Sequence, residues 1–138
     1  ITFEQKINDR NLDVSVDLPE HPVFTRADKD AVTQVVYNLI DNAVKFCTEG
    51  GVLGLKLTEG GGKIYVTISN EGNTIPPEEL PLVFDRFHKI DKARNRSQEG
   101  WGLGLYIVKT LVCSHGENIS VASRDGKTEF TFTMPLVN

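Results

Sequence analysis

The stretch DKDAVTQVVYNLIDNAVKF, residues 28–46, carries the strongest structural signal in the chain. Its apolar residues come in adjacent pairs that repeat every four positions, from Ala31-Val32 to Ala43-Val44. This spacing is typical of a helix that packs on a sheet. Asp28 or Asp30 stands near its start, where a short acceptor side chain caps free N–H groups. We therefore expect one long amphipathic helix over these residues.

Short alternating segments on both sides of this helix predict strands. Residues 12–18 alternate between apolar and polar side chains and are followed by two prolines, and residues 23–25 are a candidate for a second short strand. Residues 52–57 and 63–70 flank a glycine-rich connection, as the two strands of a hairpin do. The long helix is therefore expected to lie against a sheet.

The second half of the chain predicts further helices and two more strands. A short helix is expected at 76–80, where two prolines suit a first turn, and a longer one at 103–115, with Gly116 as its C-terminal cap. Residues 119–123 and 128–134 follow as strands. The order of elements predicts an α+β fold in two layers: a mixed, mostly antiparallel sheet covered on one face by about three helices.

The composition excludes several classes of protein. The chain has 138 residues, with 15 basic and 19 acidic side chains and a net charge of −4, which fits one globular domain better than a nucleic-acid binder. We expect neither a signal peptide nor a membrane span, because no apolar run approaches roughly 20 residues. Cys47 and Cys113 are too few for a disulfide framework, and we expect a reducing compartment.

The polar side of the long helix is the first candidate for chemistry. Asn38, Asn42 and Lys45 stand at positions i, i+4 and i+7 and so form one line along the helix. Amide oxygens are acceptable ligands for Mg²⁺, and lysine is a common partner of phosphate. Taken alone, these three residues are more simply explained as a solvated helix face.

Two glycine-containing turns are further candidates. Residues 100–105, Gly-Trp-Gly-Leu-Gly-Leu, precede the second long helix, where glycines and a helix N-terminus favour an anion. They match neither a Walker A sequence nor a dinucleotide-binding fingerprint. Residues 69–75, Ser-Asn-Glu-Gly-Asn-Thr-Ile, end a strand where a polar side chain can bind the edge of a base. Each turn alone has a simpler structural explanation.

Taken in order, these segments resemble the N, G1, F and G2 boxes of the catalytic, ATP-binding domain of bacterial sensor histidine kinases, in the GHKL superfamily. Four ordered boxes across nearly the whole chain are a far stronger signal than any one of them. The resemblance implies a Bergerat-type ATP-binding fold, ATP and Mg²⁺ as ligands, and protein histidine kinase activity. The matching segments are Asn38-x-x-x-Asn42-Ala43-x-Lys45, Asn70-x-Gly72, Phe84-Asp85-Arg86-Phe87 and Gly100-x-Gly102-Leu103-Gly104.

The resemblance also implies roles for individual residues. Asn42 is the expected Mg²⁺ ligand, and the expected catalytic residues near the phosphates are Asn38, Lys45 and Arg86. Residues 75–100 are the expected ATP lid. The other expected ATP-binding residues are Phe46, Asn70, Gly72, Ile75 and Thr128 around the adenine, and Gly100, Gly102, Leu103, Gly104 and Leu105 in the hinge and turn after the lid, with Phe84 and Phe87 anchoring the base of the lid.

Three positions modify this expectation. Asn70 stands where the family usually has an aspartate that binds the adenine amino group, and Thr74 replaces the second glycine of the G1 box. A neutral amide still accepts a hydrogen bond, so we expect ATP binding that is retained but weaker. Related ATPases carry a water-activating glutamate at the position of Asn38. Asparagine cannot serve as that base, which favours phosphoryl transfer over hydrolysis.

The acceptor of the phosphoryl group should be a histidine, and none of His21, His88 and His115 lies in the family's acceptor context. We therefore expect residues 1–138 to be a single ATP-binding domain without its dimerisation and phosphoacceptor domain, cytoplasmic and monomeric by itself. The parent protein is expected to be a membrane-anchored homodimer that acts on a response regulator. Two alternatives stay open: an anti-sigma-factor-type serine kinase, and a nucleotide-sensing regulatory module with weakened ATP binding.

Overall fold

The computed structural model describes residues 3–85 and 101–137, apart from the side chains of residues 101–103. The helices are α1 (Phe3–Asp9), α2 (Lys29–Phe46) and α3 (Trp101–Ser114), and a short 3-10 helix, η1, spans Leu80–Leu82. The strands are β1 (Asp13–Asp17), β2 (Val52–Gly60), β3 (Lys63–Glu71), β4 (Ile119–Arg124) and β5 (Lys127–Pro135).

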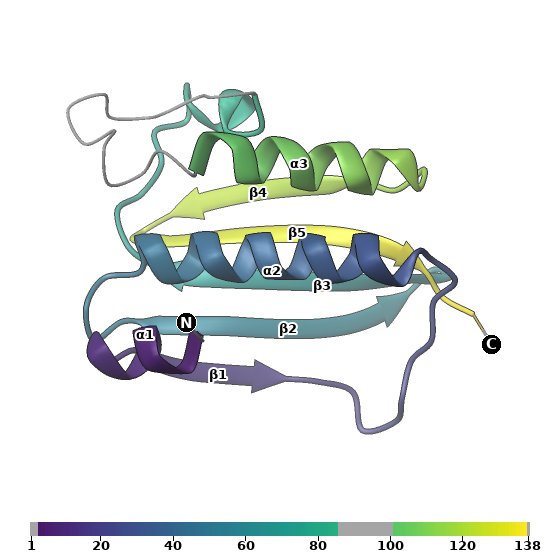
Figure 1. Ribbon diagram of the computed structural model, residues 1–138, viewed down its shortest axis with the longest axis horizontal. Helices are drawn as coiled ribbons and strands as arrows, with labels where there is room; N and C mark the ends of the chain where they lie inside the picture. Colours follow the sequence, from purple (N-terminus) through teal and green to yellow (C-terminus); the bar gives the residue numbers. More distant parts are fainter. Residues whose placement is uncertain (1–2, 86–100, 138) are drawn as a thin grey trace.

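The five strands form one mixed sheet in the order β1-β2-β3-β5-β4. β1 pairs with β2 in parallel, and all other neighbouring strands in this sheet are antiparallel. The helices α2 and α3 lie side by side over one face of the sheet, and the short α1 lies near β1 and β2 (Figure 1). The predicted fold is confirmed: two layers, with the helices on one face of a mostly antiparallel sheet.

The core lies between the two long helices and the sheet. Alternate residues of β3 and β5 face the helices, as the period of two in their sequences predicts. The buried side chains in this layer include Val35, Leu39, Ala43 and Val44 of α2, Leu105, Val108 and Val112 of α3, and Ile64, Ile68, Phe130, Phe132 and Met134 of the strands. The apolar stripe of residues 28–46 is therefore the inner face of α2.

The N-terminus of α2 begins where the sequence predicts it. The carboxylate of Asp28 accepts hydrogen bonds from the backbone N–H groups of Asp30 and Ala31, at 2.9 and 3.2 Å. These are two of the N–H groups that a helix leaves without internal partners. Asp28, rather than Asp30, is the capping residue.

Two segments near the N-terminus differ from prediction. The helix α1 was not predicted, because its seven residues are mostly polar and none is buried. It forms against α2, where the ring of Phe3 lies 5.0 Å from that of Tyr37. The candidate strand at 23–25 is reduced to an isolated bridge between Phe24 and Val137. Both outcomes depend on partners far along the chain.

The region around the predicted lid also differs in detail. Residues 76–79 form a turn, closed by a hydrogen bond from the N–H of Glu79 to the carbonyl oxygen of Pro76 at 2.9 Å, and the short helix comes after it as η1. The helix α3 begins at Trp101, so Gly102 and Gly104 lie inside its first turns rather than in a turn before it. Glycine disfavours a helix by roughly 1 kcal/mol. The helix nevertheless includes both glycines, because the burial of the residues that follow stabilises α3 by more than this cost.

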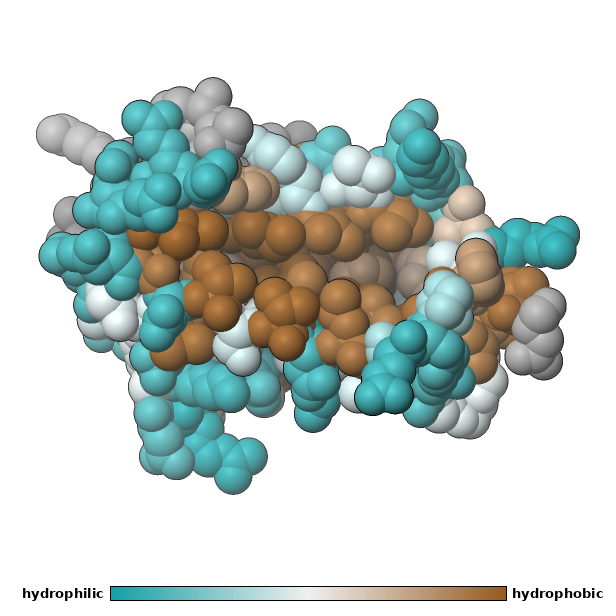
Figure 2. All heavy atoms as spheres, turned by 90° about the horizontal axis from the view of Figure 1, so that it is seen from below, coloured by the Kyte–Doolittle hydropathy of each residue, from teal (hydrophilic) through white to brown (hydrophobic). Residues whose placement is uncertain are grey.

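One face of the molecule carries exposed hydrophobic side chains. Val14 and Val16 of β1 pair with Leu53 and Leu55 of β2 and therefore share the helical face of the sheet, yet each is more than half exposed. Figure 2, seen from below relative to Figure 1, shows hydrophobic residues gathered in a band along the side of the molecule where β1 lies. Within residues 3–85 and 101–137, no helix is long and apolar enough to cross a bilayer.

A buried carboxylate connects the start of β3 to the loop after α3. Glu117 is 7% exposed; it receives hydrogen bonds from Lys63 at 2.7 and 2.8 Å and from the hydroxyl of Thr133 at 2.7 Å. Burial raises the pKa of Glu117, but these hydrogen bonds and the charges of Lys63 and His115 outweigh it, so the pKa lies below its usual value. The ionised form is therefore the one that stabilises the fold.

Replacement of Glu117 by glutamine should lower the free energy of unfolding at pH 7 by about 1–3 kcal/mol, because Lys63 and Thr133 lose a charged acceptor that is itself buried. The folded-state pKa lies below the unfolded value of about 4.3, so this stabilisation is present above that value and is lost as the pH falls through the folded pKa. Urea unfolding at several pH values measures it. Glu129→Gln, in an exposed pair with Lys127, should change little; an equal loss in both variants at all pH values would contradict the prediction.

Candidate functional site

Two amide side chains of α2 lie on the side of the helix that faces α3. Asn42 is 8% exposed, and its Oδ1 is buried without a hydrogen-bond partner among the described residues. One turn earlier, Asn38 lies 2.8 Å from the side-chain amide of Gln34, from which it accepts a hydrogen bond, and donates to the carbonyl oxygen of Gly104 at 3.4 Å. These asparagines therefore lie next to the helix interface and do not form a fully solvated face.

Lys45, the third predicted residue on this line, has a different environment. Its ammonium forms an ion pair with Asp41 at 3.0 Å, and the other carboxylate oxygen of Asp41 lies 3.9 Å from the ammonium of Lys6 in α1. The side chain of Lys45 is 36% exposed. A phosphate that binds Lys45 would therefore share its ammonium with Asp41 or displace that carboxylate.

The end of β3 approaches the end of α2 closely. A Cβ atom on Gly72 would lie 2.4 Å from the carbonyl oxygen of Phe46 and 3.1 Å from Nδ2 of Asn70. The side chain of Asn70 is 4% exposed and lies across from Thr128 of β5 in the sheet register. Four of the residues predicted to surround an adenine thus lie close together: β3 pairs with β5 and places Thr128 beside Asn70, and Gly72 after β3 meets Phe46 at the end of α2.

Hydroxyl groups connect the other residues predicted around the adenine. Thr128 Oγ1 lies 2.8 Å from Ser123 Oγ, which accepts a hydrogen bond from the N–H of Ile75, also at 2.8 Å. Thr74 Oγ1 accepts a hydrogen bond from the N–H of Gly126 at 2.7 Å. The threonine that departs from the family pattern therefore supports the turn between β4 and β5, a role that no local signal indicates.

The glycine-rich stretch is described only from residue 101 onward. A Cβ atom on Gly104 would meet no heavy atom of the described residues within 4 Å, so these residues leave open space beside the first turns of α3. Leu105 is buried, and Phe84, an expected lid anchor, packs edge-on against Phe130 with ring centroids 5.8 Å apart. The predicted site residues outside the described parts of the chain are Arg86, Phe87 and Gly100, together with the side chain of Leu103. His88, one of the three histidines outside the acceptor context, also lies outside them.

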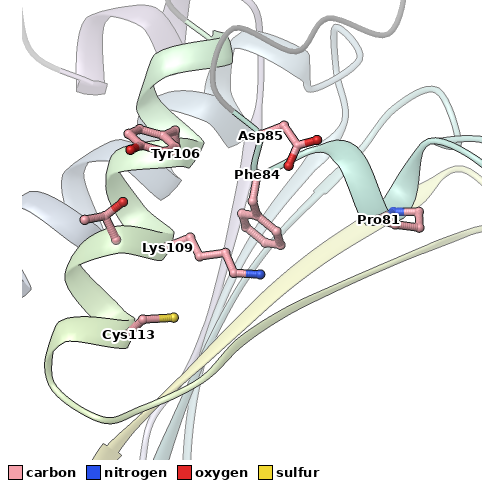
Figure 3. A pocket seen from close by; sticks show the side chains of 7 residues that line it. Pro81, Phe84, Asp85, Tyr106, Lys109 and Cys113 are labelled. Atoms are coloured by element: carbon pink, nitrogen blue, oxygen red, sulfur yellow. The ribbon is translucent and has the colours of Figure 1, made fainter.

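A hollow of about 390 Å³ lies beside α3 and η1 (Figure 3). Tyr106, Lys109 and Cys113 line it from successive turns of α3, and Phe84 and Asp85 line it from the opposite side. The ammonium of Lys109 lies 5.3 Å from the ring centroid of Phe84, within the range of a cation–π interaction. The sequence did not indicate this hollow, because one of its walls belongs to the predicted lid and the other to α3, and only the tertiary structure brings them together.

The two cysteines are free thiols in different environments. Cys47 follows α2 and is 1% exposed. Burial raises the pKa of its thiol, although hydrogen bonding with the Glu71 backbone and the charge of Arg10 oppose this. Cys47 is therefore a packed core residue, and Cys113 at the hollow is the more accessible thiol of the two.

One glycine without a predicted role has a steric one. A Cβ atom on Gly54 in β2 would lie 2.3 Å from the hydroxyl oxygen of Ser69, its partner in β3. Glycine at this position therefore lets the two strands pair with Ser69 in place. The reason could not be read from the sequence, because it depends on the strand register.

The residues present suit a magnesium ion held largely by nucleotide oxygens. A buried amide oxygen without a partner costs roughly 1–3 kcal/mol, and Mg²⁺ accepts such a neutral oxygen while keeping water and phosphate ligands. Within the part of the chain that the structure describes, Asn42 Oδ1 is such an oxygen. No group of three or more His, Cys, Asp and Glu side chains that could hold a metal occurs within residues 3–85 and 101–137. The ion would therefore depend on Asn42 and on a bound phosphate.

Comparison with known proteins agrees with this chemistry. A family model described as histidine kinase-, DNA gyrase B-, and HSP90-like ATPase matches residues 27–138. The sensor histidine kinase WalK of Bacillus subtilis (strain 168) is 41% identical over 121 residues, which are 86% of this chain and 20% of WalK. The sensor protein SrrB of Staphylococcus aureus (strain MRSA252) is 38% identical over 136 residues, which are 98% of this chain and 23% of SrrB. The chain thus spans about a fifth of the length of these curated relatives.

Solved structures of the same kind share the fold. The mycobacterial sensor histidine kinase MprB has a TM-score of 0.81 at 31% identity, over 97% of this chain and 90% of that chain. A nucleotide-free catalytic domain of the histidine kinase ThkA has a TM-score of 0.83 at 28% identity, over 96% of this chain and 84% of that chain. ThkA in complex with the response regulator TrrA has a TM-score of 0.81 at 26% identity, over 98% of this chain and 37% of that chain. These similarities favour the histidine kinase interpretation over the serine kinase alternative.

Proposed function

This chain belongs to the family of histidine kinase-, DNA gyrase B-, and HSP90-like ATPases, and we propose that it is the ATP-binding catalytic domain of a sensor histidine kinase. In this proposal it binds Mg-ATP, and the γ-phosphoryl group passes to a histidine in a dimerisation domain of the parent protein. The observation that carries the proposal is the buried Oδ1 of Asn42, which has no hydrogen-bond partner among the described residues and would gain one from Mg²⁺ bound with the nucleotide.

The phosphate end of the site would lie between α2 and the start of α3. Asn42 is the proposed ligand of Mg²⁺, which when bound neutralises phosphate charge. Lys45 would leave or share its ion pair with Asp41 to bind a phosphate oxygen. The open space at Gly104 lets a phosphate approach the backbone of α3, and Arg86 is proposed as a second phosphate contact.

The adenine end would lie where β3, β5 and the end of α2 meet. The amide oxygen of Asn70 would accept a hydrogen bond from the adenine amino group, with Thr128 beside it across the strand pair. Phe46 and Ile75 supply apolar surface for the ring, and Gly72 leaves the space that the ring needs near the backbone. Binding of the base is thus assigned to neutral groups.

The side chain at position 38 favours transfer of the phosphoryl group over its hydrolysis. An amide has no basic site near neutral pH, so Asn38 cannot activate a water molecule. In the structure both its oxygen and its nitrogen have partners, Gln34 and the carbonyl oxygen of Gly104, which hold it in place. Catalysis would then rest on positioning and on charge from Lys45, Arg86 and the metal.

The larger context of the domain follows from its relatives. Because this chain spans about a fifth of WalK and SrrB, we propose that it works inside a longer, dimeric protein that supplies the acceptor histidine. That protein would be anchored in the bacterial cell membrane, with this domain in the cytoplasm, and would act on a response regulator, as the structure of ThkA with TrrA suggests by analogy.

Calorimetric titration with ATP, with and without Mg²⁺, tests the binding step. We expect saturable, Mg²⁺-dependent binding by a monomeric domain. No acid-labile phosphohistidine should form when residues 1–138 are incubated with radiolabelled Mg-ATP, whereas an added histidine-containing dimerisation domain should become labelled. Failure to bind Mg-ATP at any concentration tested would overturn the proposal. Labelling of a serine-bearing partner alone would favour the serine kinase instead.

Asn70→Asp should bind Mg-ATP more tightly than the wild type, by about five- to tenfold, because a charged acceptor makes a hydrogen bond about twice as strong as a neutral one. Asn118→Asp, an exposed change of the same chemistry, is the matched control and should leave binding unaltered. Titration with Mg-ATP measures both variants. Equal or weaker binding by Asn70→Asp would mean that Asn70 does not contact the adenine amino group.

A further inference from the structure

Arg10, in the short connection between α1 and β1, binds the C-terminal end of α2. Its guanidinium donates hydrogen bonds to the carbonyl oxygens of Val44 and Cys47. Its own backbone is also held: its N–H donates to the carbonyl oxygen of Lys6 at 3.3 Å, and its carbonyl oxygen accepts from the N–H of Gly50 at 3.0 Å. Arg10 is therefore fixed to α1 and to the loop after α2 at the same time.

The end of α2 needs such a partner because it lacks the usual cap. Many helices end at a glycine with positive φ, which lets the last carbonyl oxygens find backbone partners. The C-terminal cap of α2 is instead Cys47, in an extended conformation with φ −70° and ψ 136°, and Gly50 comes only three residues later. A basic side chain at a helix C-terminus is also favoured by the helix dipole, and arginine presents several donors in one rigid plane.

The opposite side of the same helix end contacts the proposed nucleotide site. The carbonyl oxygen of Phe46 faces Gly72 so closely that a Cβ atom there would lie 2.4 Å from it. The N–H of Thr48 donates to the carbonyl oxygen of Glu71 at 2.8 Å. Residues 44–47 are therefore held between Arg10 and the turn after β3, and they include Lys45 and Phe46.

We propose that Arg10 is a positioning residue for nucleotide binding. Its two hydrogen bonds hold the end of α2 so that the side chain of Lys45 meets the phosphates and the ring of Phe46 meets the base. Arg10 acts through the backbone of residues 44–47 and lies outside all four sequence boxes. The inference rests on the proposed function, because it requires a nucleotide at Lys45 and Phe46.

A substitution series separates this role from a contribution to stability alone. Arg10→Met removes both hydrogen bonds while keeping much of the length of the side chain; Arg26→Met, at an exposed arginine without a partner among the described residues, is the matched control. Mg-ATP binding is titrated at a temperature where circular dichroism shows every variant to be folded. We expect Arg10→Met to weaken binding about tenfold, the order expected for loss of hydrogen bonds to a charged group, and Arg26→Met to bind like the wild type.

The second part of the test is a double-mutant cycle with Lys45→Met. If Arg10 acts through Lys45, Arg10→Met should weaken binding much less in the Lys45→Met background than in the wild type. If Arg10 only stabilises the fold, its substitution lowers the melting temperature and changes affinity by the same factor in both backgrounds, which would overturn the inference. Should Arg10→Met fail to fold, Arg10→Lys, which keeps the charge but not the planar fork, replaces it in the same cycle.

The outcomes distinguish this inference from the function on which it rests. A wild-type protein that does not bind Mg-ATP overturns the proposed function and, with it, the role of Arg10. A wild-type protein that binds Mg-ATP, together with an Arg10→Met variant that binds equally well, overturns the role of Arg10 alone. Weaker binding that is coupled to Lys45 supports both.

Discussion

Asn42→Leu is expected to weaken Mg-ATP binding by at least about 100-fold while the protein stays folded. The substitution keeps the approximate shape of the side chain and removes the oxygen that would bind Mg²⁺. Because Asn42 Oδ1 is buried without a partner among the described residues, its removal should raise the free energy of unfolding of the nucleotide-free protein by about 1–3 kcal/mol. Loss of binding together with a gain in stability is the result expected of a residue kept for a ligand.

Titration calorimetry with Mg-ATP and thermal unfolding without nucleotide measure these two effects separately. Asn8→Leu, the same change at an exposed position of α1, is the matched control and should alter neither. If Asn42→Leu binds Mg-ATP with wild-type affinity, Asn42 is not the magnesium ligand. If it unfolds instead, the amide has a structural partner that the described residues do not include.

Gly72→Ala is expected to disturb both the fold and the nucleotide site. Its Cβ atom would lie 2.4 Å from the carbonyl oxygen of Phe46, a backbone atom that can move only with the end of α2. Overpacking of this kind costs about 1–3 kcal/mol, and a shift of the proposed ligand-binding residues should weaken Mg-ATP binding by about tenfold or more. The backbone at Gly72 does not have a positive φ, so the effect would come from the lack of space alone.

Gly60→Ala is the control for this substitution. Gly60 ends β2 and has no positive φ, and a Cβ atom placed on it would lie more than 4 Å from every heavy atom of neighbouring described residues. It should leave binding unchanged and the free energy of unfolding unchanged or raised by up to about 1 kcal/mol. Denaturant unfolding and Mg-ATP titration of both variants give the comparison. Similar behaviour of the two alanine variants would contradict the close contact between Gly72 and Phe46.

The main elements of the fold were predictable because their signals are local. The stripe of α2, its aspartate cap and the alternation in β3 and β5 each lie within one short stretch, and the structure confirms them. The helix α1 was missed because its seven residues are mostly polar, and its two apolar side chains, Phe3 and Ile7, find packing partners only in the folded protein. The start of α3 was placed two residues late because the glycines of residues 100–104 were assigned to a turn before the helix, whereas the packing of the residues that follow outweighs the intrinsic cost of glycine in a helix.

The candidate site was predictable in its members but not in its arrangement. The sequence placed Asn38, Asn42 and Lys45 on one line, whereas the structure turns the asparagines toward α3 and pairs Lys45 with Asp41. It marked Thr74 only as a departure from a pattern, whereas the structure shows its hydroxyl accepting a hydrogen bond from Gly126. In both cases the deciding contact depends on where another segment lies.

By itself, the sequence determined the class of fold, the long helix, the hairpin, and the identity of four ordered boxes, because each of these is written in residues close together along the chain. Only the tertiary structure decided that the Oδ1 of Asn42 is buried without a partner in the described part of the chain, that Gly72 faces Phe46, and that Arg10 binds the end of α2. Arg10 and Val44 are 34 positions apart, and no periodicity or turn signal relates them. Such contacts arise when strands and helices pack, because the free energy of burying the shared core brings together groups that local sequence leaves independent.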